Sequence, residues 1–382
     1  MNAVTLLQVP KLVIGSGCRA QCSAYLAERG IQRAFLIAPP FGAAHAPVLL
    51  EGVAHTQIDT SIEAEPTVSG FNRILARAQS FRPDAVIGLG GGSALDVAKL
   101  VTALLDGAQK AEDVFGIGLV KGRAPLLVCI PTTSGTGSEV SPNAILLDET
   151  DNIKKGVVSP WLVPNAAFVD AELTLSVPPA VTAATGLDAL THCIEAYTNL
   201  FAHPVVDLWA IEGIRLIAQS LVEAVEQPSS LPAREKMALG SLYGGLCLGP
   251  VNTAAVHALS YPLGGWFHIP HGHANAILLP HVMRFNAPAA PERFAAVARA
   301  LGAGQASTAE ATAEAGITQL WKLIRSTGLE MRLSALGVEE NETPRLVAAG
   351  LGVTRLMKNN PRSMTLQDAE KIFHAAFRGR ED

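Results

Sequence analysis

The chain has 382 residues, of which 49% are hydrophobic and 16% are charged, and its formal net charge is −5. This balance excludes a disordered protein, and the slight negative charge argues against a nucleic-acid partner, because phosphate backbones are bound by clusters of Lys and Arg. A chain of this length exceeds one typical hydrophobic core, so we expect two domains.

The cysteines and the N-terminal segment indicate the cellular compartment. The odd number of cysteines, mostly in apolar contexts, favours a reducing cytoplasm over a disulfide-linked secreted protein. They are Cys18, Cys22, Cys129, Cys193 and Cys247. The opening segment MNAVTLLQVPKLVIGSG lacks the pattern of a signal peptide, and no apolar stretch is long enough to cross a bilayer. We therefore expect a cytoplasmic protein with no membrane partner.

The first half of the chain alternates short apolar runs with segments of helical period. We predict strands at 34–38, 84–89, 126–131 and 166–170, and helices at roughly 19–29, 68–81 and 93–105. Short apolar strands that alternate with helices are typical of a parallel, doubly wound sheet.

From about Pro178 onward the pattern changes. Segments such as 205–225 and 234–248 have helical period and are rich in Ala and Leu, and strand signals nearly vanish. We place the domain boundary near Val181, which gives an α/β domain over residues 1–180 and an all-helical domain over residues 181–382.

Two loops that follow apolar strands are candidates for binding a nucleotide. In DAVIGLGGGSALDVAK a strand ends at Leu89, three glycines follow, and a helix begins near Ser93. Backbone N–H groups at a helix N-terminus can bind phosphate, and glycine lets the backbone approach it closely. The pattern is not GxGxxG, so the standard dinucleotide fingerprint does not apply. The second loop, PTTSGTGSEV, is crowded with hydroxyls and follows the strand at 126–131. Either loop could be an ordinary connection, but the two together favour a nucleotide.

One carboxylate and three imidazoles form a candidate metal site. In TGLDALTHCIEAY, Asp188 and His192 are four residues apart, which places them on one face of a helix. His257 and His271 follow in the same predicted domain. Together they make a plausible full protein ligand set for Fe²⁺ or Zn²⁺, which could polarise a substrate oxygen. Any one of these histidines alone is more often an ordinary helix residue, but the spacing of the set favours a metal.

Five segments, taken together, resemble the iron-containing (group III) alcohol dehydrogenase family. They are GGGSALDVAK, PTTSGTGSEV, TGLDALTHCIEAY, HGHANAILLPHVMRFN and NNPR. Their order and spacing over nearly the whole chain make the resemblance specific. It implies a dehydroquinate synthase-like architecture: a Rossmann-like dinucleotide-binding domain over residues 1–180, a helical metal-binding and catalytic domain over residues 181–382, and an active site in the cleft between them.

The resemblance also implies roles for particular residues. The implied residues are Asp188, His192, His257 and His271 as metal ligands; Gly91, Gly92, Ser93, Asp96, Thr132, Thr133, Ser138 and Lys154 for the cofactor; and Asn143 near the substrate.

The chain departs from the family pattern in two places. Many members have a histidine, often assigned to proton relay, four residues after the third metal ligand. Here Tyr261 stands there, and its ordinary pKa of about 10 makes it a poor base at neutral pH, so His273 is an alternative relay. Where many members have an aspartate that binds the adenosine ribose, this chain has Ala38 and Pro39. Glu65 could replace that carboxylate in part, so both NAD and NADP stay open.

These observations predict a metal-dependent NAD(P)(H) alcohol dehydrogenase or aldehyde reductase that acts on a small alcohol or aldehyde. We expect Fe²⁺ or Zn²⁺ as the metal and a homo-oligomer, a dimer, as the assembly. The alternative is an oxo-acid reductase like the maleylacetate reductases, which would need an Arg or Lys for the substrate carboxylate. A lyase of the dehydroquinate synthase type would need more basic residues for a phosphorylated substrate.

Overall fold

The computed structural model describes residues 3–379, which divide into two compact units. The first unit spans residues 6–176, and the second begins at Val177 and includes the described residues 3–5. The boundary predicted near Val181 lies just beyond this division, inside the first long helix of the second unit, α5 (Pro179–Thr198).

The first unit is built on a six-stranded parallel sheet. In spatial order its strands are β1 (Lys11–Ile14), β9 (Ala166–Val169), β6 (Leu126–Pro131), β4 (Ala85–Gly90), β2 (Arg33–Ile37) and β3 (His55–Asp59). A second, three-stranded sheet contains β5 (Gly116–Ile117), β8 (Ile153–Val158) and β7 (Asn143–Asp148), with β7 and β8 antiparallel. The prediction of a parallel α/β sheet is confirmed. The predicted strands correspond to β2, β4, β6 and β9, whereas the other five strands were not predicted.

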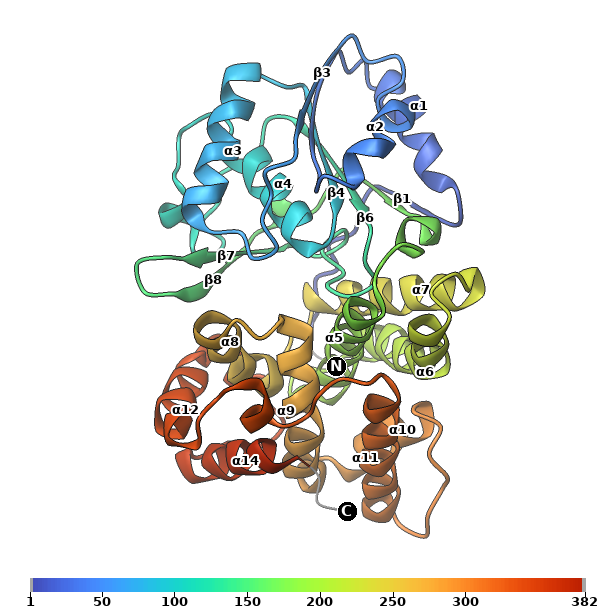
Figure 1. Ribbon diagram of the computed structural model, residues 1–382, viewed down its shortest axis with the longest axis vertical. Coiled ribbons are helices and arrows are strands. Elements are labelled where there is room, and N and C mark those ends of the chain that lie inside the picture. The colour runs from blue at the N-terminus through green and yellow to red at the C-terminus, as the bar shows by residue number, and fades with distance from the viewer. Residues whose placement is uncertain (1–2, 380–382) are drawn as a thin grey trace. The chain divides into compact units, whose positions relative to one another are not determined.

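Helices cover both faces of the large sheet. Figure 1 shows α3 (Val68–Phe81) and α4 (Gly92–Leu104) on one face, and α1 (Gln21–Glu28) and α2 (Ala46–Leu49) on the other. The alternation of β2 explains this arrangement: Phe35 and Ile37 belong to the core under α3 and α4, while Ala34 and Leu36 belong to the core under α1 and α2. A strand that is buried on both faces reads as a continuous apolar run, and this is why β2 was found in the sequence.

The second unit contains helices and no strand among its described residues. Its helices after α5 are α6 (Pro204–Glu226), α7 (Leu231–Leu248), α8 (Ala255–Phe267), α9 (His271–Asn286), α10 (Pro291–Ala300), α11 (Ala309–Ser326), α12 (Thr343–Gly352), α13 (Thr354–Met357) and α14 (Leu366–Arg378). One large apolar core joins residues of α5 to α12 and α14. Among the described residues, no helix combines the length and apolarity that crossing a bilayer requires.

The crossing of α5 and α9 is unusually close, and this crossing positions the candidate ligands. Gly272 of α9 packs on the backbone of α5, where an added Cβ would overlap the carbonyl oxygen of Ala184 and lie 3.0 Å from the Cβ of Asp188. Only a residue without a side chain fits at this contact. Because His271 precedes Gly272, the same contact sets the distance between ligand-bearing segments of the two helices.

We expect Gly272→Ala to destabilise the fold. The new methyl group meets backbone, which cannot rotate away, so the cost should be about 1–3 kcal/mol or more. Urea denaturation of chelator-treated protein would measure this cost without a contribution from metal. The matched control is Gly352→Ala, because an added Cβ there meets nothing within 4 Å. If both variants are as stable as the parent, the close crossing is not a constraint on the fold.

Candidate functional site

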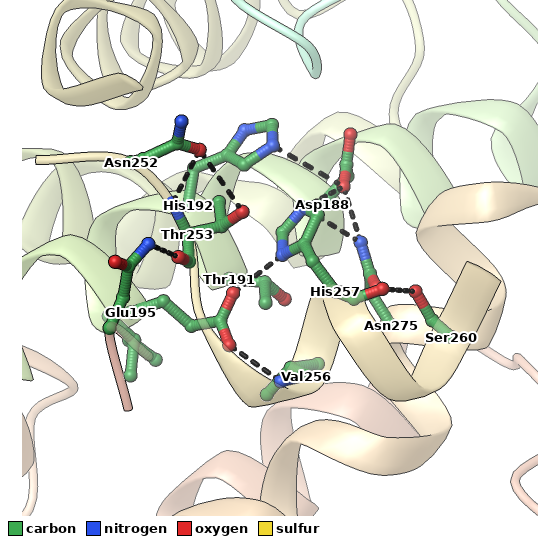
Figure 2. Close-up of polar contacts among 12 residues, drawn as sticks. Asp188, Thr191, His192, Glu195, Asn252, Thr253, Val256, His257, Ser260 and Asn275 are labelled. Carbon is green, nitrogen blue, oxygen red and sulfur yellow. Dashed lines mark hydrogen bonds and ion pairs between the residues drawn. The ribbon is translucent and has the colours of Figure 1, made fainter. Parts of the chain in front are cut away.

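Four side chains from three helices converge on one point in the second unit. Asp188 and His192 lie on α5, His257 lies on α8, and His271 is the first residue of α9. The Oδ1 atom of Asp188 is 3.8 Å from Nε2 of His192, 3.6 Å from Nε2 of His257 and 3.7 Å from Nε2 of His271. For tetrahedral ligands at about 2.1 Å from a metal, the atoms would be about 3.4 Å apart. The ligand atoms of Asp188, His192 and His257 lie close enough together to hold a divalent ion, and His271 approaches the same carboxylate oxygen; Figure 2 shows the buried part of the set.

Asn275, one turn after His271 on α9, points its amide at the same atoms. Its Nδ2 atom lies 2.7 Å from Oδ1 of Asp188, 3.2 Å from Nε2 of His257 and 3.3 Å from Nε2 of His271. Its Oδ1 atom is buried and has no hydrogen-bond partner among residues 3–379. Buried polar atoms are usually satisfied, so an unpaired oxygen beside a cluster of acceptors is a sign of a site that holds a cation. The residues present thus fit the metal that the sequence predicts.

Glu195 lies behind this set and fixes the orientation of His257. Its Oε2 atom lies 2.6 Å from Nδ1 of His257, and its Oε1 atom accepts the backbone N–H of Val256 at 2.6 Å (Figure 2). With Nδ1 facing this carboxylate, Nε2 is turned to Asp188. A carboxylate behind a ligating imidazole is a common partner in metal sites. The sequence analysis missed Glu195, although it lies seven residues after Asp188 and so shares its face of α5.

The charges of the set explain how it would accept a metal. Burial disfavours the charged form of His257, but the carboxylates of Glu195 and Asp188 outweigh it and raise the pKa of His257 to about 9. Burial alone would raise the pKa of Asp188, yet the charges of the histidines hold it well below its ordinary value. A charged carboxylate that faces imidazole nitrogens suits a bound cation, and metal binding should release any proton that a ligating nitrogen carries.

The two candidate relay residues lie in different surroundings. Tyr261 is one turn after His257 on α8, and its ring centroid is 6.0 Å from that of His271. His273 is two residues, or about 200°, around α9 from His271, and its Nε2 lies 2.6 Å from the carbonyl oxygen of Glu330. The hypothesis that His273 replaces the family's relay histidine assumed a side chain directed at the ligands, and this position does not support it.

The two candidate cofactor loops of the first unit lie against each other. Strands β4 and β6 are neighbours, and the backbone N–H of Thr132 donates to the carbonyl oxygen of Gly90 at 2.9 Å. Gly91 is the N-terminal cap of α4, and a Cβ added to it would lie 3.4 Å from Oγ1 of Thr133. A Cβ added to Gly92 would lie 2.6 Å from Cγ2 of Thr136, so this glycine is needed for the contact between the loops themselves.

Several predicted residues belong to a polar network beside these loops. The Asp96 carboxylate accepts the Ser138 hydroxyl at 2.6 Å and the backbone N–H of Ile145 at 3.0 Å. The fully buried Lys99, which the sequence analysis missed, donates to the carbonyl oxygens of Ser141 at 2.9 Å and of Asn143 at 2.8 Å. These bonds anchor the end of the second loop. Three buried atoms here have no hydrogen-bond partner within residues 3–379: Thr132 Oγ1, Ser134 Oγ and Asn143 Oδ1.

The remaining cofactor candidates form contacts on the other side of the glycine turn. Lys154 on β8 pairs with Glu65 at 2.7 Å, and the hydroxyl of Ser93 donates to the carbonyl oxygen of Ala64. Strand β2 ends at Ile37, and Pro39 lies beside the turn, where a Cβ added to Gly90 would be 3.1 Å from its Cδ. The position after β2 where many family members have a carboxylate is thus occupied by Pro39, whose ring lies against the glycine turn.

Comparisons with known proteins place the whole chain in one family. Residues 10–171 match the family model for iron-containing alcohol dehydrogenases, and residues 182–377 match that for the C-terminal part of the Fe-containing alcohol dehydrogenase family. Long-chain-alcohol dehydrogenase 1 of Geobacillus thermodenitrificans is 39% identical over 338 residues, which cover 87% of this chain and 85% of that protein.

Solved structures agree with the family match. The crystal structure of a 1,3-propanediol oxidoreductase superposes with a TM-score of 0.95 at 32% identity, over 98% of this chain and 100% of that one. The structure of sulfoacetaldehyde reductase from Bifidobacterium kashiwanohense in complex with NAD⁺ gives a TM-score of 0.89 at 27% identity, over 99% of each chain.

The parallel sheet, the helical unit and the buried ligand set define a metal- and nicotinamide-dependent oxidoreductase with the dehydroquinate synthase-like architecture. The chain belongs to the iron-containing alcohol dehydrogenase family, which uses iron and NAD(H). It is an alcohol dehydrogenase or aldehyde reductase, an oxidoreductase that acts on CH–OH groups.

We expect Glu195→Gln to weaken metal binding about 10- to 100-fold while the fold is kept. Glutamine offers one oxygen in place of two, so either His257 Nδ1 or the backbone N–H of Val256 loses its acceptor. Competition with a chelator would measure the affinity. Glu226→Gln, an exposed position at the end of α6, is the control for the lost charge. A Glu195→Gln protein that keeps metal as tightly as the parent would show that this carboxylate does not support the site.

Proposed function

We propose that each chain binds one Fe²⁺, with Zn²⁺ as the alternative, through Asp188, His192, His257 and His271. The observation that carries this proposal is the convergence of three imidazole nitrogens at 3.6–3.8 Å from one buried carboxylate oxygen. Carboxylate and imidazole ligands suit both ions, and the family favours iron. When bound, the ion supplies a Lewis acid that polarises the substrate's oxygen for the exchange of hydride with the nicotinamide.

We propose that the chain's own residues position this chemistry without an essential side-chain base. Glu195 holds the His257 ring, and Asn275 donates to Asp188 and so limits its movement. Tyr261 lies beside His271, and its hydroxyl already accepts a hydrogen bond from Arg355. The alcohol proton would then leave to water, and Tyr261 would bind or orient the substrate.

The glycine turn is our proposed site for the cofactor's pyrophosphate. Gly91, Gly92 and Ser93 open α4, where backbone N–H groups and the helix dipole favour an anion. We assign Thr132, Thr133 and Ser138 to the nicotinamide side, and the unpaired Thr132 hydroxyl supports that assignment.

We assign further roles around the two loops. Asp96 would act by holding Ser138, and Lys154 would face the cofactor while paired with Glu65. Asn143, whose Oδ1 is also unpaired, is assigned to the substrate. Pro39 stands in place of a ribose-binding carboxylate at the end of β2, and the nearby acids are paired, Asp59 with Arg77 and Glu65 with Lys154. We therefore propose that both NAD(H) and NADP(H) are accepted.

We also propose a cytoplasmic homodimer. The five cysteines are buried and form no disulfide, which suits a reducing compartment. Leu200, Phe201 and Leu208 expose more than half of their surface around the start of α6, and exposed apolar side chains that lie together often mark an interface. Light scattering of the purified protein would give the mass of the assembly.

We expect His257→Ala to lose both the metal and the activity. The three remaining ligands would leave an incomplete shell around the metal. Metal content and the reduction of short aldehydes with NADH and with NADPH would be measured on the same preparations. His374→Ala, an exposed histidine near the C-terminus, should retain one metal per chain and full activity. Full metal occupancy and turnover in His257→Ala would disprove the ligand assignment.

We expect Gly91→Ala to raise the cofactor's dissociation constant about tenfold without unfolding the protein. The protein itself has room for a methyl group there, because the nearest atom would be 3.4 Å away. The same methyl group would keep a bound phosphate from approaching the backbone. Gly92→Val should impair both stability and binding, because it also displaces Thr136. Gly122→Ala, where an added Cβ meets nothing within 4 Å, is the control, and fluorescence titration with NADH is the measurement. Unchanged binding by Gly91→Ala would mean that the turn is only structural.

A further inference from the structure

Arg355 contacts Tyr261, whose ring lies beside that of the candidate metal ligand His271. The short helix α13 packs on α8, and Arg355 from α13 donates from Nη2 to the phenol oxygen of Tyr261 at 2.9 Å. Its Cζ atom is 5.8 Å from the centroid of the Tyr261 ring, which in turn is 6.0 Å from that of His271. A continuous row therefore runs from the metal ligand His271 through the phenol to the guanidinium.

The row begins on the ligand-bearing face of α8. Tyr261 is four residues after His257, so the two side chains lie on the same side of the helix, about one turn apart. Tyr261 is 8% exposed and packs with Ala258 and Leu356, which fixes the position of its ring. The fixed ring thus holds the guanidinium beside the helix that carries His257.

Among the described residues, no carboxylate compensates the charge of Arg355. Within residues 3–379 Arg355 forms no ion pair, and its hydrogen bond to Tyr261 uses one of the five N–H donors of a guanidinium. By contrast, Arg345 of the neighbouring α12 pairs with Glu342 and lies 3.8 Å from the ring centroid of Trp266. A half-buried guanidinium that keeps free donors next to a phenol is well suited to a carboxylate, which accepts two parallel hydrogen bonds from it.

We propose that the substrate is an aldehyde, or the matching primary alcohol, whose far end carries a carboxylate that binds to Arg355 and Tyr261. The reacting carbonyl oxygen would lie toward Asp188 and the three histidines, so the proposal rests on the proposed function for the reaction itself. A single cation with a phenol matches a monoanion, whereas a phosphate dianion would call for further basic groups. The flat guanidinium fork favours a carboxylate among monoanions.

The test compares two substrates that differ only at the far end, 4-oxobutanoate and its neutral amide 4-oxobutanamide. With metal-loaded, full-length protein, kcat/KM for the acid should exceed that for the amide about tenfold or more, mostly through KM. Arg355→Met should bring this ratio close to one, and Arg355→Lys, which keeps the charge but loses the fork, should give an intermediate ratio. The ratio within each variant is the readout, because a general loss of activity cancels in it.

Two further variants separate recognition from charge and from folding. Lys358→Met removes an exposed positive charge three residues away and should leave the ratio unchanged. Tyr261→Phe removes the hydroxyl that anchors Arg355 and should lower the ratio in part. An aldehyde sulfonate in place of the acid tests the other monoanion; preference for it over 4-oxobutanoate would overturn the assignment of a carboxylate.

A binding measurement keeps the proposal testable if the catalytic assay fails. Calorimetric titration of the metal-loaded protein with butanoate and with butanamide should show that only butanoate binds and that Arg355→Met abolishes this binding. If no aldehyde is reduced but butanoate binds through Arg355, the proposed reaction is wrong and the carboxylate site stands. The proposal is overturned if the parent protein does not prefer the acid, or if Arg355→Met or Arg355→Lys keeps the parent ratio and butanoate affinity.

Discussion

The buried carboxylate of Asp188 is the interaction on which the helical unit depends. A carboxylate so far from water is costly unless other groups compensate its charge. Here the compensation comes from three helices: His192 from its own helix α5, His257 from α8, and His271 and Asn275 from α9. The same contacts therefore tie the centre of the unit together and gather the ligands. A metal ion strengthens an arrangement that the protein's own charges already favour.

Around this centre, the surrounding residues limit how the ligands can move. The Glu195 carboxylate bonds both to Nδ1 of His257 and to the backbone N–H of Val256, so this one side chain fixes the imidazole ring and the start of α8. In the first unit, Asp96 has a similar position, since it joins the hydroxyl of Ser138 to the backbone of β7. In each unit an acidic side chain, buried in Glu195 and partly buried in Asp96, holds two separate segments through two hydrogen bonds. This design allows polar loops and helix ends to be rigid without a large apolar contact of their own.

The fold was predictable from the sequence where burial was complete on both faces. Strand β4 is buried at every residue and reads as one apolar run, whereas β3, HTQID, is largely polar and was missed. Asp188 and His192 could be proposed as metal ligands from the sequence because they follow helical spacing. Glu195 and Asn275 share helix faces with ligands and could have been found from that periodicity. Arg355 could not, because it meets Tyr261 across 94 residues of sequence and only the packing of α13 on α8 joins them. The relay role proposed for His273 rested on its nearness to His271 in the sequence, whereas its Nε2 atom lies 2.6 Å from the carbonyl oxygen of Glu330.

The close crossing at Gly272 has a consequence for how this enzyme can evolve. Because Gly272 has no side chain, α9 packs directly on α5 next to Asp188 and His271. A change in the packing of these two helices therefore also changes the distance between the two ligand residues. Natural selection for a more heat-resistant protein commonly replaces glycines in helices by alanine. At this crossing such a change would also move the ligand-bearing backbone, so it would be removed by selection on the reaction. Adaptation to temperature in this lineage should accordingly accumulate on the outer helices, such as α10 and α11, and leave the α5–α9 contact as it is.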